Sequence, residues 1–192
     1  PARDALRVAL EEANRRIFAM PTAEAGYRPG STVVAVLVHA NGAEVAHVGD
    51  SRVYLVHAGA VSQVTRDHSM VQEMVDRGLI RPEEAATHPD ANKILRALGI
   101  SREVEVEVRP EPLRYVAGDV IVMCSDGLSD LVAAGEILDL AGSQPPAQAA
   151  GKLVDLANAR GGHDNVTALV LRFKTTANTS DAATIVKTVA IT

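Results

Sequence analysis

The sequence predicts a single α+β domain whose strands are antiparallel. Helical and strand patterns alternate along its 192 residues, and 47% of these residues are hydrophobic, which is enough for one core. Aromatic residues make up only 3%, so aliphatic side chains must fill that core. Short strand-like segments follow one another closely after residue 31, with a hairpin signal at Asn41-Gly42, which indicates an antiparallel meander.

The opening segment predicts an amphipathic helix. Leu6, Leu10, Ala13 and Ile17 recur at helical spacing, and the helix should end near Met20-Pro21.

Four strands should follow in the meander. The first is a nearly unbroken β-branched run, as expected for a strand that is buried on both faces. Gly49-Asp50-Ser51 interrupts the meander between its second and third strands. The predicted strands are Thr32–His39, Glu44–Val48, Arg52–His57 and Val61–Val64.

Residues 65–100 differ in composition and predict a helical insertion over the sheet. Gly78 and His88-Pro89 separate three short helical patterns. These patterns are Met70–Arg77, Pro82–Ala86 and Asn92–Leu98.

The remaining residues return to alternating strands and helices. Glu103–Val108 alternates Glu with Val, which is typical of a half-buried strand, and the apolar run Val120–Cys124 indicates a central strand. The later elements are helices at Leu128–Leu140 and Pro146–Ala159, a strand at Val166–Phe173 and a strand-like run at Ile185–Ile191.

Charge and composition exclude several classes of function. The net charge is −5 and no run of Lys or Arg occurs, which argues against binding nucleic acid or an anionic membrane. No apolar run approaches the length of a membrane span. The single Cys124 leaves no internal disulfide and fits a cytoplasmic protein.

Three carboxylates stand where predicted strands end or break. Asp126 follows the apolar strand and precedes Gly127, Asp164 precedes the last strand, and Asp50 lies at the interruption. Taken one by one, each has an ordinary explanation: a helix cap for Asp126, an Asx turn for Asp164 and a bulge for Asp50. Together they could form an all-oxygen site for Mg²⁺ or Mn²⁺, because antiparallel strands bring such ends together.

Other reactive side chains predict no second chemistry. The histidines show no zinc spacing, and we expect His39, His47 and His57 to be hydrogen-bonded or solvent-facing rather than ligands. Cys124 should be buried in its strand, which disfavours a thiolate phosphatase. Ser125 lacks the G-x-S-x-G setting of a nucleophile, so no catalytic residue is assigned beyond the metal ligands.

Five motifs occur in a specific order between residues 31 and 173. Their order and spacing resemble the bacterial type-2C, metal-dependent serine/threonine protein phosphatases. The motifs are Gly49-Asp50-Ser51-Arg52-Val53-Tyr54, Thr65-Arg66-Asp67-His68-Ser69, Arg96-Ala97-Leu98-Gly99, Ser125-Asp126-Gly127-Leu128 and Asp164-Asn165-Val166-Thr167.

The resemblance implies a fold and a metal site. Two antiparallel sheets would pack as a sandwich flanked by helices, in a domain of residues 1–173 with a flap at 65–100; residues 174–192 would be a tail of unknown role. Two Mn²⁺ or Mg²⁺ ions would lie at one end of the sandwich. Asp126 and Asp164 would be core ligands, and Asp50 would help Asp126 to hold a third, weaker ion.

The chain departs from the family pattern at its start. In the family, an Asp-Gly-x-Gly-Gly motif precedes the helix that residues 1–20 resemble. The motif does not occur in these residues, so we expect the fold to be N-terminally incomplete. The activity implied is hydrolysis of phosphoserine and phosphothreonine by a metal-activated water, and whether these residues alone are active stays open. The alternatives are a catalytically silent pseudophosphatase that binds a partner, and a phosphatase dedicated to one regulatory protein.

The expected partners are a phosphorylated protein and a serine/threonine kinase. The expectation is a cytoplasmic monomer that binds neither nucleic acid nor membrane.

Overall fold

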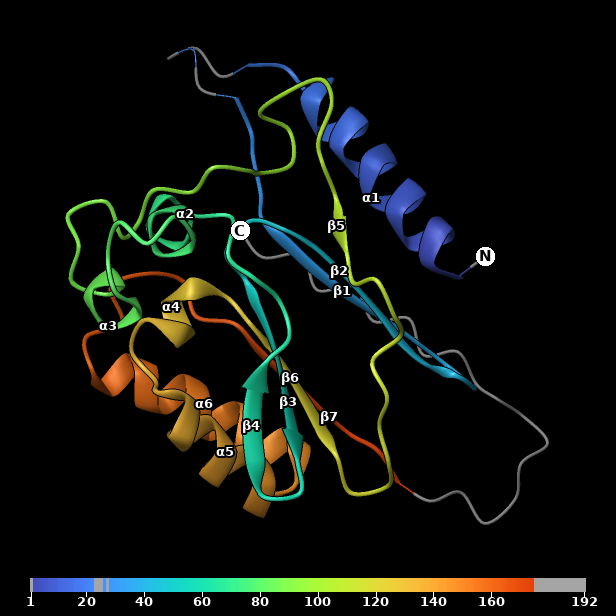
Figure 1. The fold of residues 1–192 in the computed structure, drawn as a ribbon, viewed down its shortest axis with the longest axis vertical. Coiled ribbons are helices and arrows are strands. Elements are labelled where there is room, and N and C mark those ends of the chain that lie inside the picture. The colour runs from blue at the N-terminus through green and yellow to red at the C-terminus, as the bar shows by residue number, and fades with distance from the viewer. Residues whose placement is uncertain (1, 23–25, 27, 175–192) are drawn as a thin grey trace.

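Two antiparallel sheets form the centre of the molecule, as the α+β prediction requires (Figure 1). The computed structural model describes residues 2–22, 26 and 28–174. Three strands pair in the order β1-β2-β5, and four pair in the order β4-β3-β6-β7. The strand-like run predicted at Ile185–Ile191 lies outside the described residues.

The three-stranded sheet contains β1 (Val33–His39), β2 (Gly42–Val48) and β5 (Glu107–Val108). The hairpin predicted at Asn41-Gly42 is confirmed, since β1 and β2 pair from Val33↔Val48 to His39↔Gly42. The prediction that the first strand is buried on both faces is wrong. β1 lies at the edge of this sheet and is half-buried along its whole length, whereas the central β2 is fully buried.

The four-stranded sheet contains β4 (Ala60–Gln63), β3 (Arg52–His57), β6 (Val120–Cys124) and β7 (Ala168–Arg172). The central strand β6 is buried at every residue, as predicted. β3 pairs with β4 on one side and with β6 on the other.

The predicted continuous meander is wrong, because β2 and β3 belong to different sheets. The chain crosses between the sheets at Gly49, whose φ of +108° is open mainly to glycine. A Cβ on Gly49 would also lie 2.4 Å from the Thr32 methyl group. The same Gly-Asp-Ser interruption that resembled a bulge is therefore a crossover between the two layers.

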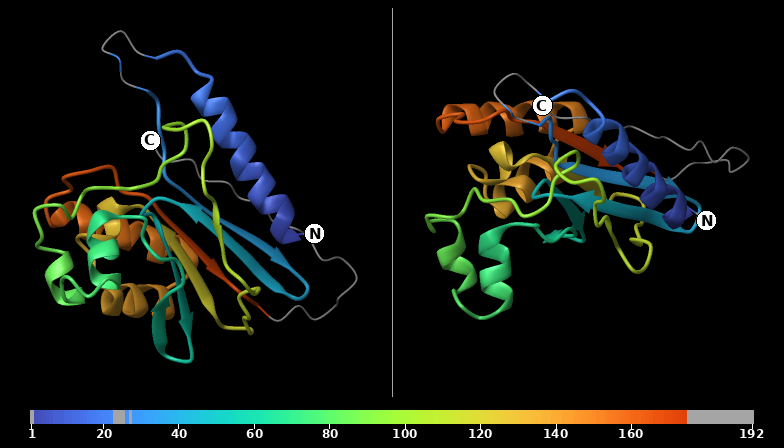
Figure 2. Two further views of the ribbon diagram at one scale, coloured as in Figure 1. Left: turned by 45° about the horizontal axis from the view of Figure 1, so that its top comes forward. Right: turned by 90° about the horizontal axis from the view of Figure 1, so that it is seen from above.

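Side chains between the sheets form one core, and helices cover the outer faces (Figure 2). Val45 of β2 and Val53, Ile121 and Met123 of the other sheet belong to the inner cluster. On the far face of the four-stranded sheet, a second cluster joins β6 to α4 (Asp126–Ser129), α5 (Ala134–Ser143) and α6 (Pro146–Ala159). Helix α1 (Ala2–Phe18) packs on the three-stranded sheet. The sandwich flanked by helices is thus confirmed.

The segment 65–100 contains two helices rather than the three predicted. These are α2 (Met70–Asp76) and α3 (Pro82–Ala85). The predicted helix Asn92–Leu98 is wrong: this stretch is irregular and held by isolated backbone bridges, of which Leu98 to Ser31 is one (N···O 2.8 and 3.1 Å). Pairing with distant backbone replaces the local helical hydrogen bonds there.

Two other elements differ in extent from the predictions. The helix predicted at Leu128–Leu140 is broken into α4 and α5, and the carboxylate of Glu136 accepts a hydrogen bond from the Ala133 amide at the start of α5 (3.0 Å). In Glu103–Val108 the Val residues are half-buried and the Glu residues exposed, as the alternation predicts. Only its last two residues pair with β2. Among the described residues, no helix combines the length and apolarity needed to span a membrane.

Candidate metal centre

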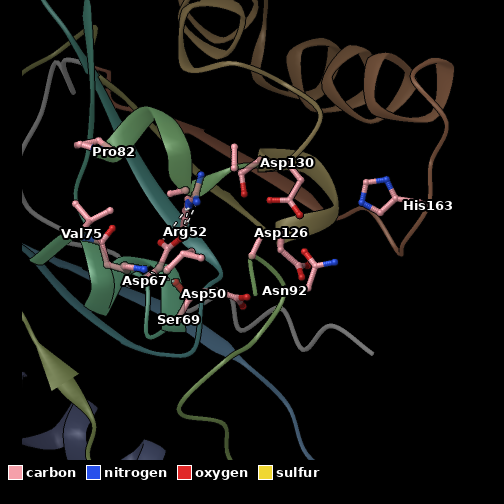
Figure 3. Close-up of a pocket in the computed structure, with 16 residues that line it drawn as sticks. Asp50, Arg52, Asp67, Ser69, Val75, Pro82, Asn92, Asp126, Asp130 and His163 are labelled. Atoms are coloured by element: carbon pink, nitrogen blue, oxygen red, sulfur yellow. Dashed lines mark hydrogen bonds and ion pairs between the residues drawn. The ribbon is translucent and has the colours of Figure 1, made fainter. Parts of the chain in front are cut away.

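The pairing of β3 with β6 brings Asp50 and Asp126 to the same end of the sandwich. Arg52 lies opposite Cys124 in the antiparallel register, so the residues two positions beyond each, Asp50 and Asp126, extend from adjacent strand ends. Both line a cavity of about 560 Å³, together with Asp130 (Figure 3). The structure therefore brings together two of the three carboxylates singled out in the sequence.

Asp164 approaches Asp126 from the opposite side. Cys124 lies opposite Ala168 in the pairing of β6 with β7, so the residues before β7 lie next to those after β6. Asp126 and Asp164 both line a second cavity of about 560 Å³. Asp126 is thus common to the two cavities, with Asp50 in one and Asp164 in the other.

Gly127 and Ser125 hold the two strand ends close together. A Cβ on Gly127 would lie 2.5 Å from the carbonyl oxygen of Asn165, so only glycine fits this approach. The Ser125 hydroxyl donates to the same carbonyl (3.2 Å) and accepts from the Thr167 amide (3.0 Å). Ser125 has a structural role here, in keeping with the absence of a nucleophile motif.

The ordinary roles considered for Asp126 and Asp164 are met only in part. Ser125, not Asp126, is the N-cap of α4, and Asp126 accepts from the next amide, that of Gly127 (2.8 Å). Asp164 accepts from the Asn165 amide in the same way (2.6 Å). In the described part of the chain, the second oxygen of each carboxylate has no hydrogen-bond partner and is open to another ligand.

Burial and like charge make this cluster unfavourable without a cation. Burial, and then the charge of Asp126, raise the pKa of Asp50 to about 6. The same two causes, in the same order, raise the pKa of Asp130. Within the described part of the chain, none of Asp50, Asp126 and Asp130 forms an ion pair. A divalent cation with oxygen ligands is the chemical group that such a set fits.

Asp67 lines the same cavity but has its own partners. Arg52 donates to it from Nη2 (2.6 Å) and Nε (2.9 Å), and Gln63 donates at 2.9 Å. Burial disfavours the charge of Arg52, but the hydrogen bonds and charge of Asp67 outweigh this effect and raise the Arg52 pKa. This pair supports the cavity wall, as the dashed lines of Figure 3 indicate.

Sequence reasoning missed Asp130 and His163 as cavity residues. One signal could have found Asp130: it lies four residues after Asp126, a spacing that places two side chains on one helical face. The Asp130 amide indeed donates to the Asp126 carbonyl (2.8 Å). His163 stands in an irregular loop, where no periodic pattern could have placed it.

The strand histidines are hydrogen-bonded and Cys124 is buried, as predicted. A ring nitrogen of His47 lies 2.7 Å from the Arg66 carbonyl, one of His57 lies 2.9 Å from Asp119, and one of His39 lies 3.3 Å from Glu44. Burial raises the pKa of the Cys124 thiol to about 12, so the thiolate is not formed at neutral pH.

Comparisons with known proteins point to one family. The family model described as "Protein phosphatase 2C" matches residues 2–74. A putative protein phosphatase 2C-type from Streptococcus pyogenes is 39% identical over 166 residues, which cover 86% of this chain and 67% of the relative. The serine/threonine protein phosphatase PstP of Mycobacterium tuberculosis is 43% identical over 141 residues, but these are 73% of this chain and 27% of PstP.

Solved structures point to the same family. The crystal structure of M. tuberculosis PstP superposes with a TM-score of 0.80 at 38% identity, covering 91% of this chain and 73% of that one. A structure of the PstP catalytic domain "in complex with 2 Manganese ions" superposes with a TM-score of 0.75 at 38% identity, covering 88% and 70%. The chain thus spans about two thirds of the streptococcal relative and about a quarter of full-length PstP.

Proposed function

The chain belongs to the protein phosphatase 2C family, and we propose that it acts in a metal-dependent phosphatase that hydrolyses phosphoserine and phosphothreonine in proteins. One observation carries the proposal. Asp50, Asp126 and Asp130 share a cavity and form no ion pair among the described residues, and burial raises the pKa of two of them. A binding module without catalysis would have no use for this arrangement, so the pseudophosphatase alternative is the weaker one.

Mn²⁺ or Mg²⁺ is the proposed cofactor. Asp126 and Asp164 would hold core ions, and Asp50 with Asp126 would hold a further one, which agrees with the two cavities that share Asp126. The related PstP domain has been solved with two manganese ions. When bound, such ions supply positive charge for a phosphoryl group and lower the pKa of a coordinated water.

The protein's own residues give the cavity two different walls. Carboxylates line one side, and apolar side chains of α2, α3 and the residue after α3 line the other: Val71, Val75, Pro82, Ala85 and Ala86. We propose that residues 65–100 form a flap on the domain of residues 1–173. Its apolar wall would hold the phosphorylated segment and exclude bulk water, while Arg52 and Asp67 keep the wall in place.

The substrate, the kinase, the oligomeric state and the location belong to the same proposal. The substrate would be a phosphorylated protein, and a serine/threonine kinase would catalyse the opposing phosphorylation. The phosphatase itself would be a cytoplasmic monomer. Restriction to a single regulatory protein is the alternative within the same chemistry, and it depends on surfaces that contact the substrate outside the cavity.

The test is release of phosphate from a phosphothreonine peptide, measured with Mn²⁺ and with EDTA. It uses both this chain and the full-length protein. We expect Mn²⁺-dependent turnover that Asp126→Ala abolishes, because both cavities lose their shared carboxylate. Asp50→Ala should reduce turnover less, since it removes a ligand from one cavity only.

Asp155→Ala is the matched control, because Asp155 is exposed on α6 and away from both cavities. Full activity of Asp126→Ala in the intact protein would contradict the site assignment. Equal losses for Asp126→Ala and Asp50→Ala would contradict the proposed hierarchy of ions. A folded full-length protein without any turnover would favour the silent module.

A further inference from the structure

A buried polar cluster lies beside the metal centre at the base of segment 65–100. His68 lies just before α2, and its ring stacks on that of His47 from β2, with centroids 4.5 Å apart. Glu107 of β5 and Arg96 approach the outer nitrogen of His68, Nε2, at 3.0 and 3.4 Å. Both His68 and His47 are buried.

The cluster has the ligand atoms of a metal site, but its hydrogen bonds do not fit one. Ligand atoms of His47, His68 and Glu107 all lie within 4.8 Å of one another. However, the Gly49 amide points at Nδ1 of His68 (3.2 Å), and an amide can only donate. Nδ1 must therefore be unprotonated, and the neutral ring carries its proton on Nε2, where it donates to Glu107 at 3.0 Å. Nη1 of Arg96, 3.4 Å from Nε2, can only donate and so forms no hydrogen bond with this tautomer.

The neutral form of His68 is the favoured one. Burial lowers the pKa of this ring, and the nearby charge of Arg96 acts in the same direction, whereas the hydrogen bond that His68 donates to Glu107 opposes them. A ring with its proton on Nε2 offers no lone pair there to a metal ion. The three residues instead form a hydrogen-bonded chain that runs from Glu107 through His68 to Gly49.

This chain ends on the residue that precedes Asp50. His68 makes two hydrogen bonds to Gly49: its ring accepts from the Gly49 amide, and its own amide donates to the Gly49 carbonyl (3.0 Å). Gly49 has a positive φ, and glycine without such contacts has wide conformational freedom. The two bonds together therefore restrict the backbone from which the Asp50 side chain extends.

We propose that His68 is a positioning residue for Asp50, with Glu107 holding the His68 ring in the required tautomer. The inference rests on the proposed function, in which Asp50 helps to hold a divalent ion. Because Asp126 repels it, the Asp50 carboxylate would turn away from the cavity unless its backbone were fixed. His68 supplies that constraint from a distance and touches neither substrate nor ion.

Two substitutions separate the roles of the ring nitrogens. In His68→Asn, the amide oxygen can take the place of Nδ1 and accept from Gly49. In His68→Gln, the polar group reaches the place of Nε2, and the acceptor for Gly49 is lost. We expect His68→Gln to weaken the weakest Mn²⁺ site about tenfold, as loss of an outer-shell partner commonly does. His68→Asn should stay within about threefold of the wild type.

The measurement is Mn²⁺ binding, followed by the electron paramagnetic resonance signal of free Mn²⁺ during titration. Phosphate release and thermal melting are recorded on the same samples. In an Asp50→Ala background, His68→Gln should have no further effect on Mn²⁺ binding, because its target is gone. Glu107→Ala tests the tautomer without disturbing a buried side chain and should weaken binding in the same direction; Glu103→Ala is its exposed control.

Equal Mn²⁺ affinity in the wild type and both His68 variants would overturn the inference. So would an undiminished effect of His68→Gln in the Asp50→Ala background, or absence of Mn²⁺ binding by the wild type. If His68→Gln does not fold, an unchanged Mn²⁺ affinity in Glu107→Ala would overturn it. If Mn²⁺ affinity depends on His68 as expected but the full-length protein releases no phosphate, the positioning role stands and the proposed function fails.

Discussion

At the scale of single residues, the cavity disfavours the ionised form of Asp50. Its pKa is raised from an ordinary value of 3.8 to about 6, chiefly because it is buried and then because Asp126 is near. A group whose pKa is higher in the folded than in the unfolded chain stabilises the fold below pH 3.8 and loses that contribution as the pH rises through 6. In the metal-free protein, Asp50 is therefore destabilising at pH 7.5.

Asp50→Asn should thus stabilise the metal-free protein at pH 7.5. We expect its free energy of unfolding in EDTA to rise by on the order of 1 kcal/mol, because the carboxylate is partly screened by water. The gain should shrink toward pH 4.5, where the wild-type carboxylate is largely protonated when folded. Urea denaturation of both proteins at the two pH values measures this difference.

Saturating Mn²⁺ should reverse the order, since binding stabilises the protein that has the ligand. A gain that is equal at both pH values would contradict the electrostatic explanation. A wild type more stable than Asp50→Asn in EDTA at pH 7.5 would contradict it as well.

At the scale of elements, the site depends on three strand ends that meet. The β3–β6 register places Asp50 near Asp126, and the β6–β7 register places Asp164 on the other side. Gly127 is a point of close approach, with the Asn165 carbonyl oxygen 2.5 Å from where a Cβ would be. The carboxylates are brought together by strand pairing rather than by proximity in the sequence.

Gly127→Ala should therefore damage both stability and metal binding. The added methyl group would push the Asp164 loop away from β6, and we expect a loss of about 1–3 kcal/mol in the free energy of unfolding. Mn²⁺ affinity should fall with it. Denaturation and Mn²⁺ titration of the variant measure both effects.

Gly151→Ala is the matched control. A Cβ on Gly151 meets no atom within 4 Å, and this residue lies inside helix α6, where alanine is the better helix former by about 1 kcal/mol. The control should be neutral or slightly more stable. A Gly127→Ala variant as stable as Gly151→Ala, with unchanged Mn²⁺ affinity, would show that the close approach is not required.

At the scale of the whole molecule, the sequence predicted local elements better than their assembly. The apolar run Val120–Cys124 has an unambiguous pattern, and it is the buried central strand. Periodicity carries no information on which sheet a strand joins, so the sequence predicts a meander where the chain crosses between the sheets at Gly49. The same limit explains Asn92–Leu98, where pairing with the distant Ser31 outweighs helical propensity.

The candidate site was predictable in its residue types but not in its environment. Asp50, Asp126 and Asp164 were recognisable as acids at strand ends. Asp130 and the hydrogen bond from Gly49 to His68 depend on contacts between segments far apart in the sequence or on local helix geometry. The pairing of β3, β6 and β7 in one sheet brings the three acids to two cavities that share Asp126.

The most direct test of the central claim is a crystal structure with Mn²⁺, located by anomalous scattering at the manganese edge. It should use the full-length protein or its complete catalytic domain. We expect Asp126 oxygens to coordinate manganese, with Asp164 in the same core site and Asp50 on a further ion. Manganese peaks that contact none of these carboxylates, at concentrations that support turnover, would contradict the account.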